Sequence, residues 1–420
     1  MQLYNTYSQQ IEEFAARDKR VSLYVCGITP YDTTHLGHAF TYHTFDVLIR
    51  YLEAQGIAVT YAQNVTDIDD DILKRAQRDG KDWFALGSEW TAYFIQDMLS
   101  LNVRPPEYYP RATDVIPEIV EIDAQLIARG HAYASGGNVY FDAASFKRFG
   151  QLSHIPPDQM LTIANERGNR ADDPHKRNPL DFVLWQAAAE AEPSWPSPWG
   201  DGRPGWHIEC TAMNRKYLGD SVDIHGGGGD LVFPHHECEI AQAESATGVV
   251  PFVRIWMHVA MVRKDGEKMS KSLGNLVWVR ELLNDYSPDA VRLYLSAHHY
   301  RHSWEWNLAD FERYVDMSDR WRAAARLADT GTKAMTMGGF RQVVVRALED
   351  DLTTPQVVGA LDELAGRLLA GNLRPEDLRD GQNILRECAG WLGMRLDQDA
   401  VEERVTNGWS RHLKRFMPQS

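Results

Sequence analysis

Two segments of the chain place imidazole and ammonium groups where they could bind phosphate. His35 and His38 belong to the tetrapeptide HLGH, which precedes a helical pattern, and Gly37 between them lets a flat ring approach the backbone. Backbone N–H groups and the dipole at the start of a helix favour an anion. The later segment GEKMSKSLGN presents Lys268 and Lys271 on a glycine-flanked loop, which suits charge that builds up on a polyphosphate. Either segment alone is also compatible with a structural role, but the two together, in this order, are far more specific than either.

Thiol, imidazole and carboxylate side chains elsewhere in the chain form a candidate set of metal ligands. Cys26 ends an apolar run, VSLYVCGI, and Cys210 lies in the segment GRPGWHIECTAMN. His235 and Glu239 are four residues apart and therefore share one face of a predicted helix. Two thiolates, an imidazole and a carboxylate are an acceptable four-ligand set for zinc. The scattered spacing leaves unconnected core cysteines as an alternative, and Cys238 could replace Glu239 as a ligand.

The elements that must position these side chains follow a strand–helix–strand order. The apolar run over residues 21–28 predicts a buried strand, and residues 38–55 carry apolar side chains at helical spacing. Gly56 ends this helix, and residues 58–69 predict the next strand. A strand, a crossover helix and a second strand form a parallel unit. The fold class that we predict is therefore α/β, with a Rossmann-like, doubly wound parallel sheet.

The division of the 420 residues into parts follows from where this rhythm breaks. We predict the first half of the sheet in residues 1–110 and its second half, with the metal site and the lysine loop, in residues 206–285. The intervening residues 111–205 combine a helix, a hairpin-like piece and a polar Pro/Gly-rich run, which predicts an inserted α+β subdomain. Residues 286–420 have mostly helical patterns and predict a C-terminal helical domain.

Composition disfavours several classes of protein. Hydrophobic residues make up 44% of the chain and charged residues 25%, as in ordinary globular proteins. We find no run of about 18 apolar residues, the length that a membrane span needs. The N-terminus lacks the basic and apolar regions of a secretory signal, and four scattered cysteines are too few for a disulfide framework. The net charge of −15 disfavours indiscriminate binding of nucleic acid. We therefore expect a cytoplasmic protein without a membrane association.

Seven segments together resemble the class I cysteinyl-tRNA synthetases. They are CGITPYD, HLGH, YAQNVTDIDD, KRNPLDFVLW, EPSWPSPWGDGRPGWHIECTAMN, HGGGGDLVFPHHE and KMSKSLGN, spread over roughly residues 20–310. HLGH and KMSKS resemble the two signature motifs of class I aminoacyl-tRNA synthetases, and the same core is similar to the cysteine ligase of mycothiol biosynthesis. The resemblance implies ATP-dependent activation of L-cysteine to cysteinyl-adenylate, and a stem-contact region within residues 286–420.

The resemblance also implies roles for individual residues. A zinc ion, with an open position for the substrate thiolate, is implied to be held by Cys26, Cys210, His235 and Glu239. Catalytic contacts to the phosphates of ATP, which binds with Mg²⁺, are implied for His35, His38, Lys268 and Lys271. The positions that match contacts to ATP or the adenylate are Gly27, Thr29, Thr41, Asn64, Thr66, Gly226, Gly227, Gly228, Asp230 and Val262. The positions that match walls of the cysteine pocket are Trp206 and His225.

The acceptor of the cysteinyl group is the least determined part of the resemblance. Ile28, Pro30 and the absence of arginine at Phe40 resemble the mycothiol enzyme, whereas Glu239 fits the four-ligand zinc site of the synthetase. The C-terminal segment NGWSRHLKRFMPQS either contacts RNA or forms an amphipathic helix with a solvated basic face. We predict a monomer that acts on the acceptor end of tRNA. The alternatives are an amino-sugar acceptor, glucosaminyl-inositol, and a non-catalytic paralogue of the synthetases.

Overall fold

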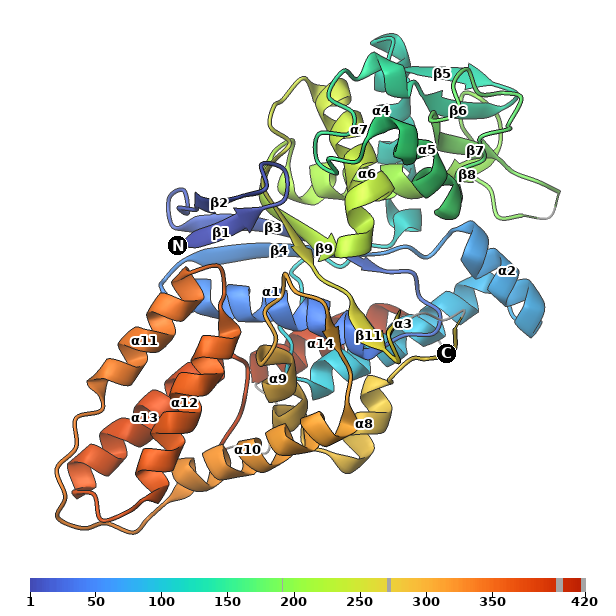
Figure 1. The fold of residues 1–420 in the computed structure, drawn as a ribbon. Coiled ribbons are helices and arrows are strands. Elements are labelled where there is room, and N and C mark those ends of the chain that lie inside the picture. The colour runs from blue at the N-terminus through green and yellow to red at the C-terminus, as the bar shows by residue number, and fades with distance from the viewer. Residues whose placement is uncertain (191, 270–272, 398–402, 417–420) are drawn as a thin grey trace.

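The computed structural model describes residues 1–190, 192–269, 273–397 and 403–416 (Figure 1). At its centre is a sheet of four parallel strands in the order β10–β9–β3–β4. The strands are β3 (Arg20–Ile28), β4 (Ala58–Val65), β9 (Val222–Gly228) and β10 (Val253–Val259). The predicted α/β class with a parallel, Rossmann-like sheet is therefore confirmed.

Helices cover both faces of this sheet. α1 (Leu36–Ala54) follows β3 on one face, whereas α6 (Trp206–Leu218) and α7 (Glu237–Thr247) lie on the other face (Figure 1). Phe45 and Leu48 of the predicted apolar stripe of α1 are fully buried in the main core. The strand order reverses where β3 lies between β9 and β4. Ligands of open α/β sheets bind at the carboxyl ends of strands at such a point.

A second, antiparallel sheet is formed by the segment between the two halves of the central sheet. Its strands are β5 (Ala132–Ser135), β6 (Asn138–Phe141), β7 (Phe182–Ala187) and β8 (Gly202–Pro204), in that order. The segment also contains α4 (Ile116–Ala128) and α5 (Pro157–Glu166). α4 packs against α6 and α7, so it extends the helical layer of the central sheet. The proposed division at residues 110, 205 and 285 remains a prediction.

Helices dominate the chain after β10. β11 (Val262–Lys264) pairs with β12 (Glu267–Lys268) and with β13 (Trp304–Glu305). The helices are α8 (Val279–Asp285), α9 (Pro288–Ser296), α10 (Leu308–Arg326), α11 (Gly338–Glu349), α12 (Thr354–Leu369) and α13 (Pro375–Trp391). A buried ion pair from Arg292 of α9 to Asp46 of α1 ties this region to the central sheet. None of the helices in the described ranges has the length and apolar character that a membrane crossing requires.

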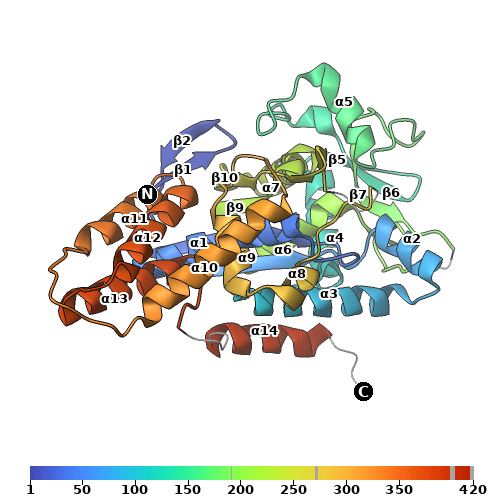
Figure 2. The same ribbon diagram turned by 60° about the horizontal axis from the view of Figure 1, so that its bottom comes forward.

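The remaining elements are an N-terminal hairpin, two helices that follow β4 and the last described helix. β1 (Gln2–Asn5) and β2 (Gln10–Glu13) form an N-terminal hairpin beside β10. α2 (Asp70–Asp79) and α3 (Trp83–Ser100) follow β4. The last described helix, α14 (Glu403–Phe416), leaves α11–α13 and packs along α3 (Figure 2).

The contacts of α14 bear on the two interpretations of the C-terminal segment. Trp409 donates its indole N–H to the Val103 carbonyl at 2.8 Å, and His412 Nε2 lies 2.8 Å from the Pro106 carbonyl oxygen. Phe416 is also buried. The aromatic face of the segment is therefore used for packing, which favours an amphipathic helix with a solvated basic face.

Candidate active site

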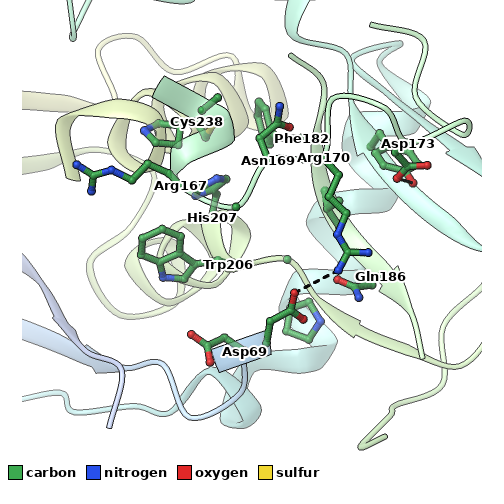
Figure 3. A pocket seen from close by; sticks show the side chains of 18 of the residues that line it. Asp69, Arg167, Asn169, Arg170, Asp173, Phe182, Gln186, Trp206, His207 and Cys238 are labelled. Carbon is green, nitrogen blue, oxygen red and sulfur yellow. Dashed lines mark hydrogen bonds and ion pairs between the residues drawn. The ribbon is translucent and has the colours of Figure 1, made fainter. Parts of the chain in front are cut away.

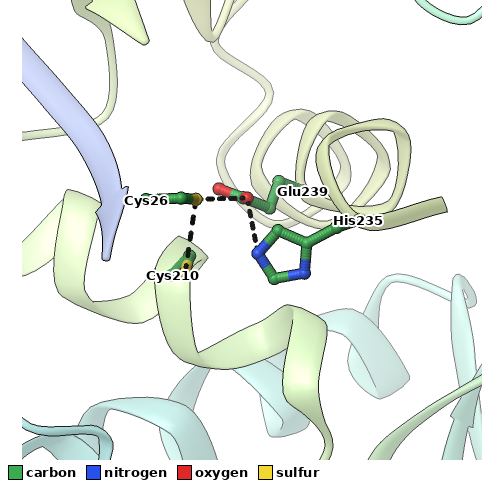
Figure 4. Close-up of side chains that lie close together, drawn as sticks. All are labelled: Cys26, Cys210, His235 and Glu239. Carbon is green, nitrogen blue, oxygen red and sulfur yellow. Dashed lines mark hydrogen bonds and ion pairs between the residues drawn. The ribbon is translucent and has the colours of Figure 1, made fainter. Parts of the chain in front are cut away.

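Four side chains of the predicted metal site meet at the carboxyl end of β3 (Figure 4). Cys26 Sγ lies 3.8 Å from Cys210 Sγ and 3.7 Å from Glu239 Oε1. His235 Nε2 lies 3.2 Å from the same Glu239 oxygen. One ligand atom from each of the four residues lies within 4.8 Å of the others, and all four residues are buried. The structure thus brings together every residue of the predicted zinc set.

These spacings suit a single tetrahedral zinc ion. Zinc binds sulfur at about 2.3 Å and oxygen at about 2.0 Å, so two sulfurs on one ion lie about 3.8 Å apart, and a sulfur and an oxygen about 3.5 Å apart. Burial raises the pKa of the Cys26 thiol and of the Glu239 carboxyl. A cation would therefore be needed to keep both groups ionised in this interior. Within the described part of the chain, Glu239 Oε2 also lacks a hydrogen-bond partner. The donor set fits zinc.

Two further imidazoles border the thiol of Cys26. His236 Nε2 lies 3.2 Å and His225 Nε2 3.7 Å from Cys26 Sγ. His225, predicted as a wall of the cysteine pocket, is fully buried beside the metal cluster. Cys26, His225, His236 and Glu239 form a second possible ligand group among the described residues. Cys238 belongs to neither group and lines a neighbouring cavity instead. The geometry therefore favours Glu239 over Cys238 as the fourth ligand.

Local backbone features place the ligands. α6 begins directly after Gly205, where a Cβ atom would lie 2.1 Å from the Val183 carbonyl oxygen. Only glycine allows the start of α6 to approach β7 so closely, and this approach sets the position of Cys210. His235 lies in a separate turn, Val232–His236, which precedes α7. The non-helical residue of this turn, Phe233, precedes His235. The predicted pairing of His235 with Glu239, four residues apart on one helical face, is therefore present.

The HLGH segment forms the beginning of α1. His35 is the N-cap residue, and its Nδ1 accepts the Gly37 N–H at 3.1 Å. His38 Nδ1 accepts the His35 N–H at 3.5 Å, and the two rings stack with centroids 3.8 Å apart. Because each neutral ring accepts through Nδ1, its proton resides on Nε2. Both histidines can therefore donate through Nε2 to an oxygen of a phosphate group. Thr41 donates to the Gly37 carbonyl at 3.2 Å, one turn further along the helix.

Lys268 and Asp230 contact each other. Lys268 Nζ lies 2.7 Å from Asp230 Oδ2, and Arg167 Nη1 lies 3.8 Å from the same oxygen. Burial acts to raise the pKa of Asp230, but Lys268 and Arg167 outweigh it and hold this pKa below its usual value. The residue predicted to meet the pyrophosphate is thus paired with the residue predicted to bind ribose. Lys271 lies outside the described residues.

The predicted adenylate contacts at the ends of β3 and β4 lie side by side. A Cβ atom at Gly27 would lie 1.6 Å from the Asn64 carbonyl oxygen, so these strand ends can meet only with glycine there. The Gly27 N–H donates to Asn64 Oδ1 at 2.7 Å, and Asn64 Nδ2 donates to Thr66 Oγ1 at 3.3 Å. Asn64 and Thr66 are both buried.

The predicted adenylate contacts Gly226, Gly227 and Gly228 form the end of β9. At Gly226 a Cβ atom would lie 2.0 Å from the Phe45 ring, so helix packing alone requires glycine there. At Gly227 it would lie 2.9 Å from Leu231, and at Gly228 it would lie 2.6 Å from Asp230. The sequence analysis predicted nucleotide binding for these glycines but did not predict that Gly226 packs against α1. Val262, predicted with the same group, is buried in β11.

A cavity of 610 Å³ adjoins the metal cluster (Figure 3). Among the predicted site residues, Thr29 and Trp206 line it, and the Trp206 ring centroid lies 4.4 Å from that of His235. Most of its other walls were not predicted. They come from the start of α2 and from the inserted segment, which contribute Asp69, Asp70, Phe149, Arg170, Asp173, Phe182 and Gln186. The signal for them lay in the segments YAQNVTDIDD and KRNPLDFVLW, which supply several of these side chains.

Known families and relatives agree with this geometry. Residues 12–315 match the family described as tRNA synthetases class I (C), catalytic domain. An L-cysteine:1D-myo-inositol 2-amino-2-deoxy-α-D-glucopyranoside ligase of Frankia casuarinae is 47% identical over 371 residues, 88% of this chain and 79% of that protein. A cysteine–tRNA ligase of Dehalococcoides mccartyi is 42% identical over 404 residues, 94% of this chain and 86% of that protein.

Solved structures show the same fold at low sequence identity. Methionyl-tRNA synthetase of Mycobacterium tuberculosis, in complex with methionyl-adenylate, superposes with a TM-score of 0.62 at 15% identity and covers 89% of each chain. The sheet and the helices that cover it therefore belong to a known architecture.

Proposed function

Because the chain belongs to the class I (C) tRNA synthetase family, we propose that it activates L-cysteine with ATP and transfers the cysteinyl group to tRNA. The observation that carries the proposal is the buried cluster of two thiols, an imidazole and a carboxylate at the carboxyl end of β3. This cluster adjoins the glycine run that ends β9, because a Cβ atom at Gly227 would lie 3.5 Å from the Cβ of Cys26. A ligand held there would have both its sulfur and its carboxylate near predicted functional groups.

The cluster offers a physical basis for choosing cysteine over serine. Zinc held by Cys26, Cys210, His235 and Glu239 would supply a Lewis-acidic site with a preference for sulfur over a hydroxyl oxygen. The surrounding residues exclude water and orient the amino acid, with Trp206 beside His235 as one wall. A hydrophobic pocket alone separates substrates that differ by one small group only about 10- to 200-fold.

Adenylate formation needs the cysteine carboxylate to attack the α-phosphorus of ATP, with loss of pyrophosphate. His35 and His38 hold phosphate oxygens through their Nε2 protons, at the N-terminus of α1, where the helix dipole favours an anion. Lys268 leaves Asp230 to offset the charge of the departing pyrophosphate, and Lys271 assists it; Mg²⁺ accompanies ATP. Asp230, once released, is available for a ribose hydroxyl.

A second acceptor is favoured by one specific observation. The Frankia relative is 47% identical, against 42% for the Dehalococcoides relative, and it is named for an amino-sugar acceptor. Against this acceptor stands Glu239, which completes the four-ligand cluster characteristic of the resemblance to the synthetases. We retain transfer to tRNA as the proposal and glucosaminyl-inositol as the second candidate.

Cysteine-dependent exchange between ATP and pyrophosphate tests the activation step. We expect exchange with L-cysteine, and exchange with L-serine lower by at least about a thousandfold, because a sulfur-selecting site discriminates more strongly than a hydrophobic pocket. Parallel acylation assays with tRNA and glucosaminyl-inositol then identify the acceptor. We also propose a cytoplasmic monomer, whose oligomeric state light scattering on the purified protein tests. Absence of exchange from the metal-loaded protein would leave the non-catalytic paralogue as the remaining interpretation.

A further inference from the structure

The last described helix, α14, buries one of its faces against the body of the protein. Residues that recur every three or four positions along it are at most 6% exposed, namely Val405, Trp409, His412 and Phe416. α14 packs along α3 (Figure 2) and also contacts residues 103–114, the connecting segment that leads from α3 toward α4. The role of α14 therefore depends on what the connecting segment holds.

The connecting segment (residues 103–114) extends the central sheet beyond β4. The Gln63 N–H donates to the Tyr108 carbonyl at 3.0 Å, and the Val65 N–H donates to the Pro110 carbonyl at 2.8 Å. β4 is the last strand of the four-stranded sheet, so this segment covers its open edge. Both predicted adenylate contacts at this end of β4 are direct neighbours of Val65 in the chain. The connecting segment therefore helps to fix the position of these contacts.

Arg111 joins the connecting segment to α14. Its Cζ lies 4.4 Å from the ring centroid of Phe416 in α14 and 4.8 Å from that of Phe84 in α3. A guanidinium between two aromatic rings gains a cation–π contact with each of them. Arg111 Nη2 also donates to the Arg415 carbonyl at 3.2 Å. Because the last carbonyls of a helix have no partner within it, this hydrogen bond helps to anchor the end of α14.

Two neighbours of Arg111 strengthen the same connection. Arg415 Nη1 donates to the Tyr109 carbonyl at 3.3 Å, and the Tyr109 ring meets the Trp409 ring edge-on at 5.7 Å. Arg415 also forms an ion pair with Asp114, whose carboxylate accepts the Arg111 N–H at 2.8 Å. α14 therefore contacts both the backbone and the side chains of the segment that pairs with β4.

We propose that α14 positions the adenylate-binding end of β4, and that Arg111 is the positioning residue that connects the two. This inference rests on the proposed activation of cysteine with ATP. Arg111 acts through the backbone hydrogen bonds to Gln63 and Val65 and not through contact with the nucleotide. Small displacements of substrate-contacting groups reduce binding and rate strongly. A displaced Asn64 or Thr66 would therefore weaken the use of ATP, while the proposed metal ligands, none of which belongs to β4, would stay in place.

A purely structural role for α14 predicts a different result. If α14 only stabilised the fold, a weakened contact would lower the free energy of unfolding and the fraction of folded enzyme. The apparent kcat would then fall, whereas the KM for ATP and the KM for cysteine would both stay unchanged. The two KM values, measured side by side, therefore separate positioning from stabilisation.

The experiment weakens the contact from both sides, with Arg111→Met, Phe416→Leu and the double variant. In ATP–pyrophosphate exchange we expect each single change to raise the KM for ATP about 5- to 20-fold. The KM for cysteine and the zinc content should stay within about twofold of wild type, because the metal cluster is a separate site. The double variant should be no worse than the worse single variant, since both changes remove one contact. Arg341→Met is the matched control: it removes a guanidinium that lies 5.3 Å from the Trp391 ring, between α11 and α13, and should retain both KM values.

Deuterium uptake by backbone amides measures the positioning directly. We expect Arg111→Met to increase uptake at Gln63 and Val65, whose N–H groups donate to the connecting segment, and to leave uptake in β9 at the wild-type level. An unchanged KM for ATP, an equal rise of both KM values, or unchanged uptake in β4 would each overturn the proposal. Absence of ATP–pyrophosphate exchange in the wild-type protein would instead reject the proposed function and the nucleotide role that rests on it. Deuterium uptake would still show in that case whether α14 holds the end of β4.

Discussion

The metal cluster and the cavity beside it are built in opposite ways. The four cluster residues are at most 5% exposed and come from β3 of the central sheet, from α6, from the turn before α7 and from α7 itself. The cavity is formed largely by α2 and the inserted segment, and its charged walls are open to solvent, as with the 70% exposed Arg170. The proposed function assigns the choice of amino acid to the buried cluster, whereas the cavity is a more open surface formed largely by the inserted segment. Substitutions in the two regions should therefore have separable effects.

The largest expected effect comes from Cys210→Ser. Removal of one thiolate from a buried four-ligand set should lower metal affinity and exchange activity by more than about a hundredfold each, because a hydroxyl is a poor zinc ligand. Metal content of the purified protein and ATP–pyrophosphate exchange measure the two losses.

Cys388→Ser is the matched control for this change. Cys388 is a buried free thiol of α13, far from the cluster in the fold, so its replacement should cost stability but retain the metal. A Cys210→Ser protein that kept both its metal and its cysteine selectivity would contradict the assignment of metal binding and cysteine selection to this cluster.

A smaller effect should separate the two candidate fourth ligands. Glu239→Gln removes the charge of a carboxylate whose Oε1 lies 3.7 Å from Cys26 Sγ, and we expect metal affinity to fall about 10- to 100-fold. Cys238→Ala alters a cavity-lining side chain and should leave metal affinity within about twofold of wild type. Competition with a zinc chelator measures both affinities. The reverse order of effects would show that Cys238, and not Glu239, completes the set.

Local sequence patterns predicted the strand and the helix that carry the site better than the contacts between its side chains. The apolar run ending at Cys26 and the helical spacing after His38 reflect hydrogen bonding and burial within one segment, so both elements are where they were expected. The approach of Cys210 to Cys26 depends on how α6 packs near Gly205, for which no local pattern exists; only the family resemblance indicated it.

Two other features depended on tertiary placement alone. The pair of Lys268 with Asp230 forms because β12 lies beside the turn after β9, and neither segment specifies the other. The cavity could not be predicted either, since its walls come from α2 and from a sheet inserted about a hundred residues later. The aromatic face of α14 could have served RNA or packing, and only the position of α3 decided between them.

Lys268→Met tests whether the lysine–aspartate pair belongs to the activation step or to the acceptor step. We expect exchange to slow about 10- to 100-fold, because charge on the leaving pyrophosphate loses one cation, while cysteine binding changes little. Lys264→Met, on the neighbouring strand β11, is the matched control and should retain exchange. Pre-steady-state kinetics separate binding from adenylation. A variant that activated cysteine normally but failed in transfer would assign Lys268 to the acceptor side.

The last prediction concerns the link between the central sheet and the inserted segment. Asp67, directly after β4, accepts hydrogen bonds from the Thr113 hydroxyl at 2.6 Å and the Thr113 N–H at 3.1 Å, at the start of the inserted segment. Burial raises the pKa of Asp67 to about 6, although these hydrogen bonds act to lower it. The folded protein therefore holds this proton more tightly than the unfolded chain, whose carboxyl has a pKa of about 4.

The sign of the resulting pH dependence follows from this shift. The contribution of Asp67 to stability is fully present below about pH 4 and is lost as the pH rises through about 6. In the wild-type protein this titration should lower the free energy of unfolding by about 2–3 kcal/mol between pH 4 and 7, and Asp67→Asn should abolish that decrease. Urea unfolding of both proteins over this pH range measures the difference. Parallel stability profiles for the wild-type and Asp67→Asn proteins would show that the carboxyl titrates normally.

The central claim is that one metal ion at Cys26, Cys210, His235 and Glu239 selects cysteine by its sulfur. The most direct measurement combines metal analysis of the purified wild-type protein with exchange assays using cysteine and serine, before and after removal of the metal. The account predicts one zinc ion per chain, strong preference for cysteine, and loss of exchange that added zinc restores. A metal-free protein that activates cysteine and serine equally well would contradict it.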